Sequence, residues 1–210
     1  MSDGVTETLN LKHKVGQGIS TQQFMDGMQV REMKLSNLLN TKERLISYYE
    51  NFLWARDEDK SFFDSLAENT ENTDMHCLIL CTDWCPDVIW NVPVLLRVME
   101  QTKIPTEVLL MEQHLETMDL FLTRGGRAQP IAVILNAEGD VLGHWGARPR
   151  YIQGVMDEFK QNNPDRDAPE YHQKLDDIYR NIGEIYNSDN KYQEVIIQEL
   201  RDMFSRFPRR

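Results

Sequence analysis

The stretch from residue 77 to residue 101 constrains the fold of this chain more than any other part of the sequence. Cys77 to Cys81 is an apolar run with the length of a buried strand, and Val88 to Glu100 carries apolar residues at helical spacing. The segment between them contains Pro86, and proline is favoured in the first turn of a helix, where its missing N–H costs nothing. We therefore expect a strand, a tight turn and a helix in this order.

Cys85 would lie at or just before the first turn of that helix. Backbone N–H groups and the positive end of the helix dipole favour a thiolate at such a position. Asp83 and Asp87 oppose this effect, because nearby negative charge raises the pKa of a thiol. Alternatively, one of the two carboxylates could relay a proton to a leaving sulfur. The junction is therefore a candidate nucleophile site.

Strand and helix patterns alternate after this first strand. The expected order is β-α-β-α-β-β-α, in which a Gly-containing turn at residues 136–140 joins the last two strands as a hairpin. Parallel crossovers combined with an antiparallel hairpin predict an α/β fold with a central mixed sheet. The later strands are expected at 107–111, 131–135 and 141–145, and the helices at 86–101, 116–123 and 151–160.

Helical patterns flank this unit on both sides. We expect a flexible arm at 1–18, an N-terminal helical extension at 19–70, the α/β domain at 71–162 and a C-terminal helical hairpin at 163–210. The extension shows helical spacing from residue 22 to 54, with breaks near Gly27 and residues 40–41, and a short helix at 61–67. The terminal helices would cover the domain or, as a second possibility, form a homodimer.

Charge and composition exclude several classes of function. The chain of 210 residues has a net charge of −11 and a pI near 4.9, whereas nucleic acid and anionic membranes attract basic surfaces. No apolar run approaches the ~20 residues of a membrane span, and the first residues lack the pattern of a secretory signal. We expect a cytoplasmic protein that binds neither partner, and the sequence indicates no cofactor.

Three cysteines fall within nine residues: Cys77, Cys81 and Cys85. Zinc binding with His76 as a fourth ligand is one reading of this cluster. On an extended strand, however, Cys77 and Cys81 would lie about 13 Å apart at ~3.3 Å per residue, which is too far to share one ion. We therefore predict no metal site. Cys81 remains a possible resolving thiol for Cys85, although packing in the core is the simpler role.

Four features follow one another in a fixed order. Trp84-Cys85 stands at the strand-to-helix junction, Pro93 lies eight residues after the cysteine, Pro130 precedes a strand and Gly146 ends the hairpin. Residues 75–160 thereby resemble the thioredoxin-like fold, which carries Trp-Cys-Gly-Pro-Cys, a helix-kinking proline, a cis-proline and a glycine at these places. More narrowly, the chain looks like a group of bacterial thioredoxin-family proteins of obscure function.

Two departures from the family pattern shape the expected activity. Val88 replaces the second cysteine of the family motif, and Ile79 replaces a buried carboxylate. The resemblance then implies a monothiol oxidoreductase that acts through Cys85 on protein disulfides or on low-molecular-weight thiols. A non-catalytic binding module is the alternative, and Thr82 offers a weaker similarity to peroxiredoxins. The residues expected to bind substrate are Trp84, Pro86, Asp87, Gln129, Pro130 and Gly146.

Overall fold

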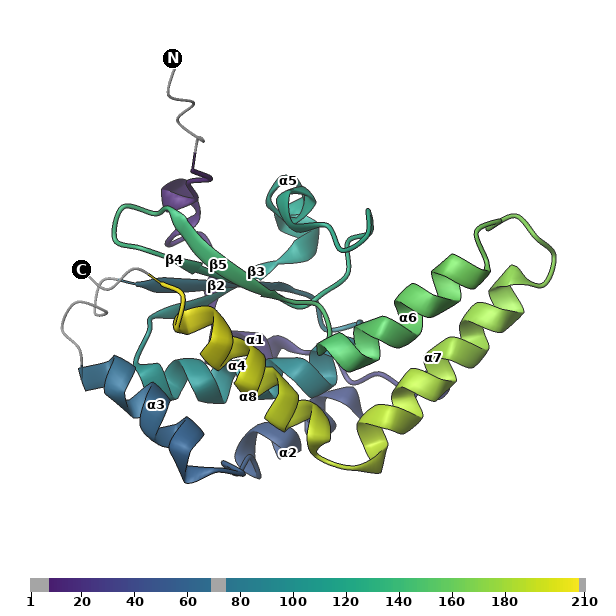
Figure 1. The fold of residues 1–210 in the computed structure, drawn as a ribbon, viewed down its shortest axis with the longest axis horizontal. Helices are drawn as coiled ribbons and strands as arrows, with labels where there is room; N and C mark the ends of the chain where they lie inside the picture. Colours follow the sequence, from purple (N-terminus) through teal and green to yellow (C-terminus); the bar gives the residue numbers. More distant parts are fainter. Residues whose placement is uncertain (1–7, 69–74, 208–210) are drawn as a thin grey trace, which may run out of the picture.

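The computed structural model describes residues 8–68 and 75–207. At its centre lies a five-stranded mixed sheet with the strand order β1-β3-β2-β4-β5 (Figure 1). β2 and β3 run parallel, and every other neighbouring pair is antiparallel. The expected α/β class with a mixed sheet is therefore confirmed. The strands are β1 (Ile19–Ser20), β2 (His76–Cys81), β3 (Thr106–Leu110), β4 (Ile131–Leu135) and β5 (Val141–Gly146).

Both faces of the sheet are covered, which explains why its central strands are continuously apolar. Alternate residues of β2 point to opposite faces: Cys77, Ile79 and Cys81 contribute to one core, and Leu78 and Leu80 to the other. Helices α1 (Thr21–Gly27), α2 (Thr41–Glu50), α3 (Asp57–Glu68), α4 (Pro86–Thr102) and α8 (Lys191–Phe204) contribute to the first core, and α5 (Leu115–Met118) to the second.

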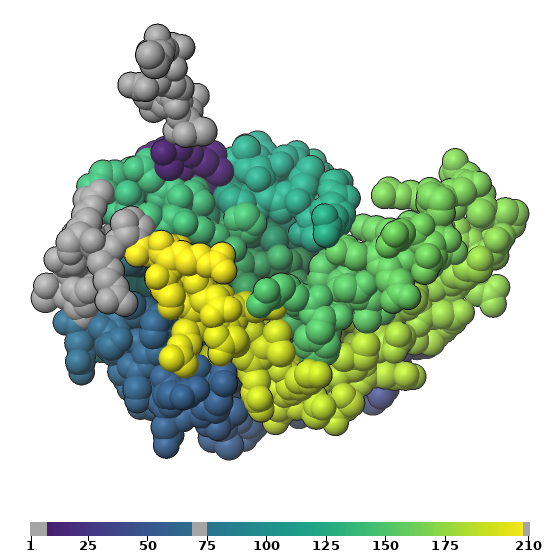
Figure 2. Space-filling model, in the orientation of Figure 1, coloured from purple at the N-terminus to yellow at the C-terminus, as the bar shows by residue number. Residues whose placement is uncertain are grey.

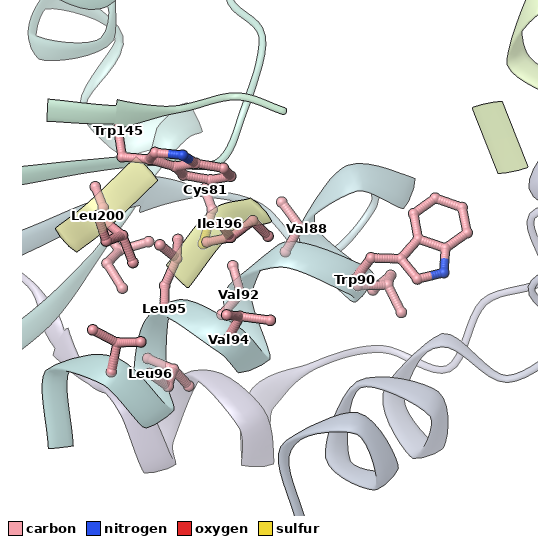
Figure 3. Packing of buried hydrophobic residues seen from close by; sticks show 14 of the residues in the cluster. Cys81, Val88, Trp90, Val92, Val94, Leu95, Leu96, Trp145, Ile196 and Leu200 are labelled. Atoms are coloured by element: carbon pink, nitrogen blue, oxygen red, sulfur yellow. The ribbon is translucent and has the colours of Figure 1, made fainter. Parts of the chain in front are cut away.

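Helix α4 is the most deeply buried helix segment of the first core. It begins at Pro86 as expected and contains Pro93 in its interior. Its apolar side chains pack against those of β5 and α8, and Figure 3 shows Val88, Leu95 and Leu96 in this layer with Trp145 and Leu200. Because α4 is enclosed, its N-terminus is held at a fixed place beside the sheet.

The two C-terminal helices and the turn between them form where expected, but they do not pair as a hairpin. Helix α7 (Tyr171–Ser188) runs back along α6 (Arg150–Asn162), and together they form an arm that projects from the domain (Figure 1). Helix α8 leaves this arm and lies against α3, α4 and β5. The apolar stripe of α8 covers the central domain, since Ile196 and Leu200 are fully buried there.

The N-terminal segment corrects the expectation of a flexible arm over its described part, residues 8–18. Leu11 is 1% exposed and its N–H donates to the carbonyl of Gly139 at 2.8 Å, while Val141 N–H donates to the carbonyl of Leu9 at 2.8 Å. Leu11 and Val15 belong to the core on the second face of the sheet, so burial of these apolar side chains orders the segment. Residues 1–7 lie outside the described ranges.

Smaller differences concern the bounds of individual elements. The extension begins with β1, which pairs with β3, and α3 starts at Asp57 rather than near residue 61. The helix expected at 116–123 is a short α5 followed by a 3-10 turn at Asp119–Phe121. The domain boundary expected at 70–71 lies outside the described residues. None of the helices within the described ranges combines the length and apolarity that a membrane crossing requires.

Candidate functional site

The thiol of Cys85 lies at the N-terminus of α4. Cys85 is the N-cap residue, with extended backbone angles, and Pro86 occupies the first helical position. Its Sγ atom lies 3.7 Å from the backbone carbonyl oxygen of Gln129, directly before Pro130. The Gln129–Pro130 peptide bond is cis. The residues that the sequence placed around the thiol are therefore brought together from α4 and from the start of β4.

Burial and, to a lesser extent, the carboxylate of Asp87 raise the pKa of Cys85 to about 12, against the opposing effects of Arg148 and of backbone N–H groups. Asp87 Oδ2 is 4.0 Å from Sγ. Although the helix N-terminus favours a thiolate, burial and Asp87 outweigh it. Cys85 is therefore a thiol at neutral pH in the unliganded chain.

Asp87 and Arg148 form a buried ion pair beside this thiol. Arg148 Nε donates to Asp87 Oδ1 at 2.8 Å and Nη2 lies 2.5 Å from Oδ2, while only 10% and 6% of the two side chains are exposed. Burial raises the pKa of Asp87, and Arg148 and the hydroxyl of Tyr186 lower it. This bidentate contact fixes the orientation of the Asp87 carboxylate, which therefore has little freedom to move with a substrate.

A second layer holds this pair in place. Asn91 Nδ2 donates to the carbonyl of Ala147 at 3.0 Å and to the hydroxyl of Tyr186 at 2.9 Å, and the ring of Tyr186 stacks on Trp90. The ring centroids are 4.3 Å apart and nearly parallel. These contacts join α4, the segment after β5 and α7, so the position of Arg148 depends on the arm.

Asp83, the other candidate proton relay, binds residues of the N-terminal extension and not the sulfur of Cys85. One of its oxygens accepts from the backbone N–H of Gln29 at 2.7 Å, and the other lies 3.2 Å from Arg31 Nη2. Asp83 therefore ties the loop before Cys85 to the N-terminal extension. Of the two candidate proton relays, only Asp87 contacts the thiol in the described structure.

A pocket of about 660 Å³ opens beside Cys85, and its size is typical of a small-molecule site. Four of the residues expected to bind substrate line it: Trp84, Pro86, Asp87 and Gln129. The indole of Trp84 is 48% exposed, and its N–H donates to Glu112. The Met33–Ser36 segment, the 123–129 loop and the two helices of the arm supply the other walls.

Pro130 directly precedes β4 and Gly146 ends β5, and the contact of these two residues with a substrate stays a prediction. Neither belongs to the described lining of the pocket. A Cβ atom at Gly146, where φ is +146°, would lie 2.3 Å from the carbonyl oxygen of Pro130. The absence of a side chain at Gly146 therefore permits close packing of β4 and β5.

Cys81 lies at the end of β2 and is fully buried, as is Cys77. Figure 3 shows Cys81 among apolar side chains near Trp145 and Ile196. Burial raises the pKa of Cys81 well above that of an exposed thiol, and the proximity of Cys85 raises it further. Its packing in the core matches the simpler of the two roles weighed for it, and a resolving role stays a prediction.

Sequence reasoning missed the cationic residues of the site. Arg148 follows Gly146 by two residues and so leaves β5 close to Pro130, but no sequence motif marks it as a site residue. Lys160, Arg166 and Tyr179 also line the pocket. They come from the arm, and no local pattern signals that the arm folds toward Cys85.

Two solved structures resemble this chain. A Pseudomonas aeruginosa protein of unknown function aligns with a TM-score of 0.52 at 16% identity, over 90% of this chain and 92% of that chain. An HIV epitope-scaffold aligns with a TM-score of 0.39 at 16% identity, over 90% and 93% of the two chains. The first likeness shows the fold alone, and no curated protein matches the chain.

A family model described as thioredoxin matches residues 20–160, which include the sheet, α4 and α6. The matched segment contains Cys85, Pro130 and Gly146 and covers more than half of the 210 residues. The chain belongs to the thioredoxin family.

Proposed function

We propose that this protein carries out thiol–disulfide exchange through the single thiol of Cys85. One observation carries the proposal: Sγ lies at the N-cap of α4, 3.7 Å from the carbonyl of Gln129, and Cys85 lines a pocket large enough for a substrate. A sulfur so placed can be approached along a fixed direction, and the helix N-terminus stabilises negative charge on it as it reacts.

The exchange proceeds in two steps that balance. The Cys85 thiolate attacks one sulfur of a disulfide, so that a mixed disulfide forms and the other sulfur leaves as a thiolate that takes up a proton. A second thiol then attacks the mixed disulfide and releases Cys85. The net reaction of the two steps converts one disulfide and one reducing thiol into one thiol and one new disulfide, in which the reducing thiol is joined to half of the original disulfide. Because Val88 occupies the place of the family's second cysteine and is buried, the second thiol comes from outside in this proposal.

Asp87 and Arg148 supply the proton transfer. Asp87 Oδ2, 4.0 Å from Sγ, accepts the thiol proton and returns it to the leaving sulfur. Burial raises the pKa of Asp87, so its carboxylate is a stronger base than that of an exposed aspartate. Arg148 remains beside the new thiolate and favours its charge.

A binding module without turnover is the competing function. It is favoured by the raised pKa of Cys85, since a thiol that stays protonated reacts slowly with disulfides. In that case the pocket would hold a partner or ligand, and Cys85 would contribute packing alone.

Exchange with hydroxyethyl disulfide in the presence of a reducing thiol separates the two functions. The wild-type chain and a Cys77→Ser control should support turnover and form one mixed disulfide at Cys85, measured by mass spectrometry. Cys85→Ser should abolish both. Turnover that survives in Cys85→Ser would move the activity elsewhere, and absence of any mixed disulfide in the wild type would favour the binding module.

A separate oxidation experiment tests whether Cys81 resolves the mixed disulfide. Mild oxidation of the wild-type chain should give an intramolecular loss of two hydrogens if Cys81 resolves the mixed disulfide, whereas mixed disulfides at Cys85 alone would exclude that role. We further propose a cytoplasmic location, because a one-cysteine exchanger of this kind requires a pool of reducing thiols.

A further inference from the structure

The pocket beside Cys85 has a charge opposite to that of the whole chain. Its lining contains six cationic side chains and one carboxylate, that of Asp87, although the chain carries a net charge of −11. The cations are Lys34, Arg124, Arg127, Arg148, Lys160 and Arg166. Concentration of positive charge at one concave site of an acidic protein points to an anionic ligand.

Half of these cations lack an ion pair with any carboxylate among residues 8–68 and 75–207. Arg148 pairs with Asp87, while Arg124 and Arg127 pair with Asp157 and Asp119, which do not line the pocket. The remaining three, Lys34, Lys160 and Arg166, form no ion pair within the described part of the chain. Their charges are available to a ligand.

The charges also act on a common volume. Lys160, Arg166, Arg148 and Arg124 line the same pocket, and burial and the charges of the three arginines lower the pKa of Lys160 while Asp157 raises it. Repulsion among them is relieved when an anion binds between them. Two or more acidic groups would match a cluster of this size.

The pocket is not purely ionic. Met156, Tyr171, Leu175 and Tyr179 contribute apolar and aromatic surface from the two helices of the arm. Gln129 is 2% exposed, and its side-chain oxygen has no hydrogen-bond partner among the described residues. A ligand with a carbon skeleton would contact this apolar and aromatic surface. In Figure 2, the molecular surface is indented between the arm and the region around α5.

We propose that this pocket binds a low-molecular-weight thiol, or its disulfide, that carries at least two carboxylate or phosphate groups, and that this compound is the exchange partner of Cys85. The proposal rests on the thiol–disulfide exchange proposed above. The pocket volume of about 660 Å³ lies within the range of small-molecule sites, which favours a small molecule over a protein disulfide. The cations would hold the acidic groups while the ligand sulfur reaches Sγ.

Binding is measured by calorimetry on Cys85→Ser, which cannot form a mixed disulfide. The probes are glutathione with two carboxylates, coenzyme A with phosphates, and cysteamine with no acidic group. At least one acidic thiol should bind more tightly than cysteamine, and the preference between the two identifies the acidic group. Binding of both acidic thiols no more tightly than cysteamine overturns the proposal.

A second experiment removes positive charge from the pocket. Lys160→Gln combined with Arg166→Gln should weaken binding of the acidic thiol by about tenfold or more, since contacts between charged groups are lost. Lys174→Gln combined with Arg180→Gln removes the same charge from α7 outside the described lining and should leave the affinity unchanged. Equal weakening by both pairs would reduce the effect to overall charge and contradict a specific site.

Exchange assays separate this proposal from the general activity. Wild-type turnover of hydroxyethyl disulfide without binding of either acidic thiol would refute the ligand class and leave the exchange activity standing. Binding of an acidic thiol without any turnover would refute the exchange activity and leave the ligand class standing. Faster exchange with insulin than with an acidic small disulfide would assign the site to proteins and overturn the proposal.

Discussion

At the scale of single residues, the reactivity of Cys85 is a balance between opposed neighbours. Burial and Asp87 disfavour the thiolate, whereas Arg148 and the N–H groups of α4 favour it. Because Asp87 and Arg148 form one buried ion pair, removal of either partner changes the field at the sulfur strongly. The Asp87 carboxylate therefore opposes the formation of negative charge on the sulfur.

The pH dependence of alkylation follows from this balance. A thiol whose pKa is about 12 is mostly protonated below that pH, so the thiolate fraction rises about tenfold for each pH unit through the neutral range. We expect the rate at which iodoacetamide modifies Cys85, followed by mass spectrometry of its peptide, to increase without a plateau up to about pH 10. A plateau between pH 7 and 9 would contradict the raised pKa.

Asp87→Asn should speed this alkylation at pH 8 by about tenfold, because the neutral amide no longer opposes the thiolate while Arg148 still favours it. Turnover of disulfides should fall nonetheless, since the proton acceptor is lost. Asp83→Asn is the matched control: Asp83 binds Arg31 and the backbone of Gln29, and its loss should leave the alkylation rate unchanged. A slower rate in Asp87→Asn would contradict this description of the site.

At the scale of elements, the position of the arm determines whether the pocket exists. Helix α7 packs against Ser36 of the N-terminal extension. At Gly183, a Cβ atom would lie 2.9 Å from the Cα of Ser36. Asn187 Nδ2 donates to the carbonyl of Ser36 at 3.2 Å. The first residue of α6, Arg150, is bound in turn by α8, because its backbone N–H donates to the carboxylate of Glu199. Each helix of the arm is thus held by an element distant in sequence.

Two glycine substitutions test the contact of α7. Alanine is favoured over glycine within helices by about 1 kcal/mol, so Gly154→Ala in α6, where nothing lies within 4 Å, should stabilise the chain by roughly that amount. Gly183→Ala should destabilise it, because backbone atoms of Ser36 cannot move aside cheaply. Urea unfolding measures both free energies, and a stabilising Gly183→Ala would show that the contact is loose.

Glu199 joins three elements through one carboxylate. It accepts from Trp145 Nε1 at 2.7 Å and from the backbone N–H of Arg150, the first residue of α6, at 2.9 Å. Glu199→Ala should lower the free energy of unfolding by about 1–3 kcal/mol, since the buried indole N–H of Trp145 loses its acceptor. Glu194→Ala, on the exposed face of α8, should change it by less than about 0.5 kcal/mol. Equal effects of the two substitutions on the free energy of unfolding would argue against a stabilising role for the Glu199 hydrogen bonds.

At the scale of the whole molecule, the domain extends beyond the segment that defines its family. The family match ends at residue 160, yet α8 supplies fully buried side chains to the main core, among them Ile196 and Leu200. A chain that ends at Asn163 would expose the surface of α4 and β5 beneath them. We expect it to lose cooperative thermal unfolding, whereas a chain that ends at Phe207 keeps α8 and should unfold like the full chain.

Local sequence patterns were sufficient for β2 to β5 and for the place of Cys85, because apolar runs and a proline at a helix start depend on neighbouring residues, whereas the two-residue strand β1 gave no such signal. They were insufficient for the partners of the arm. The apolar stripes of α6, α7 and α8 look alike in the sequence, and only packing in three dimensions decides that α7 pairs with α6 while α8 covers the sheet. Lys160 and Arg148 reach the site as a consequence of that pairing, which no motif around Cys85 encodes.

The contrast between an acidic chain and a cationic pocket has a kinetic consequence. A polyanionic ligand is repelled by the net charge of −11 at long range and attracted only near the pocket. Salt screens the long-range term first, since the Debye length shrinks from about 30 Å at 0.01 M to about 8 Å at 0.15 M. In stopped-flow measurements, association of an acidic thiol should therefore become faster as salt is added, while its residence time shortens.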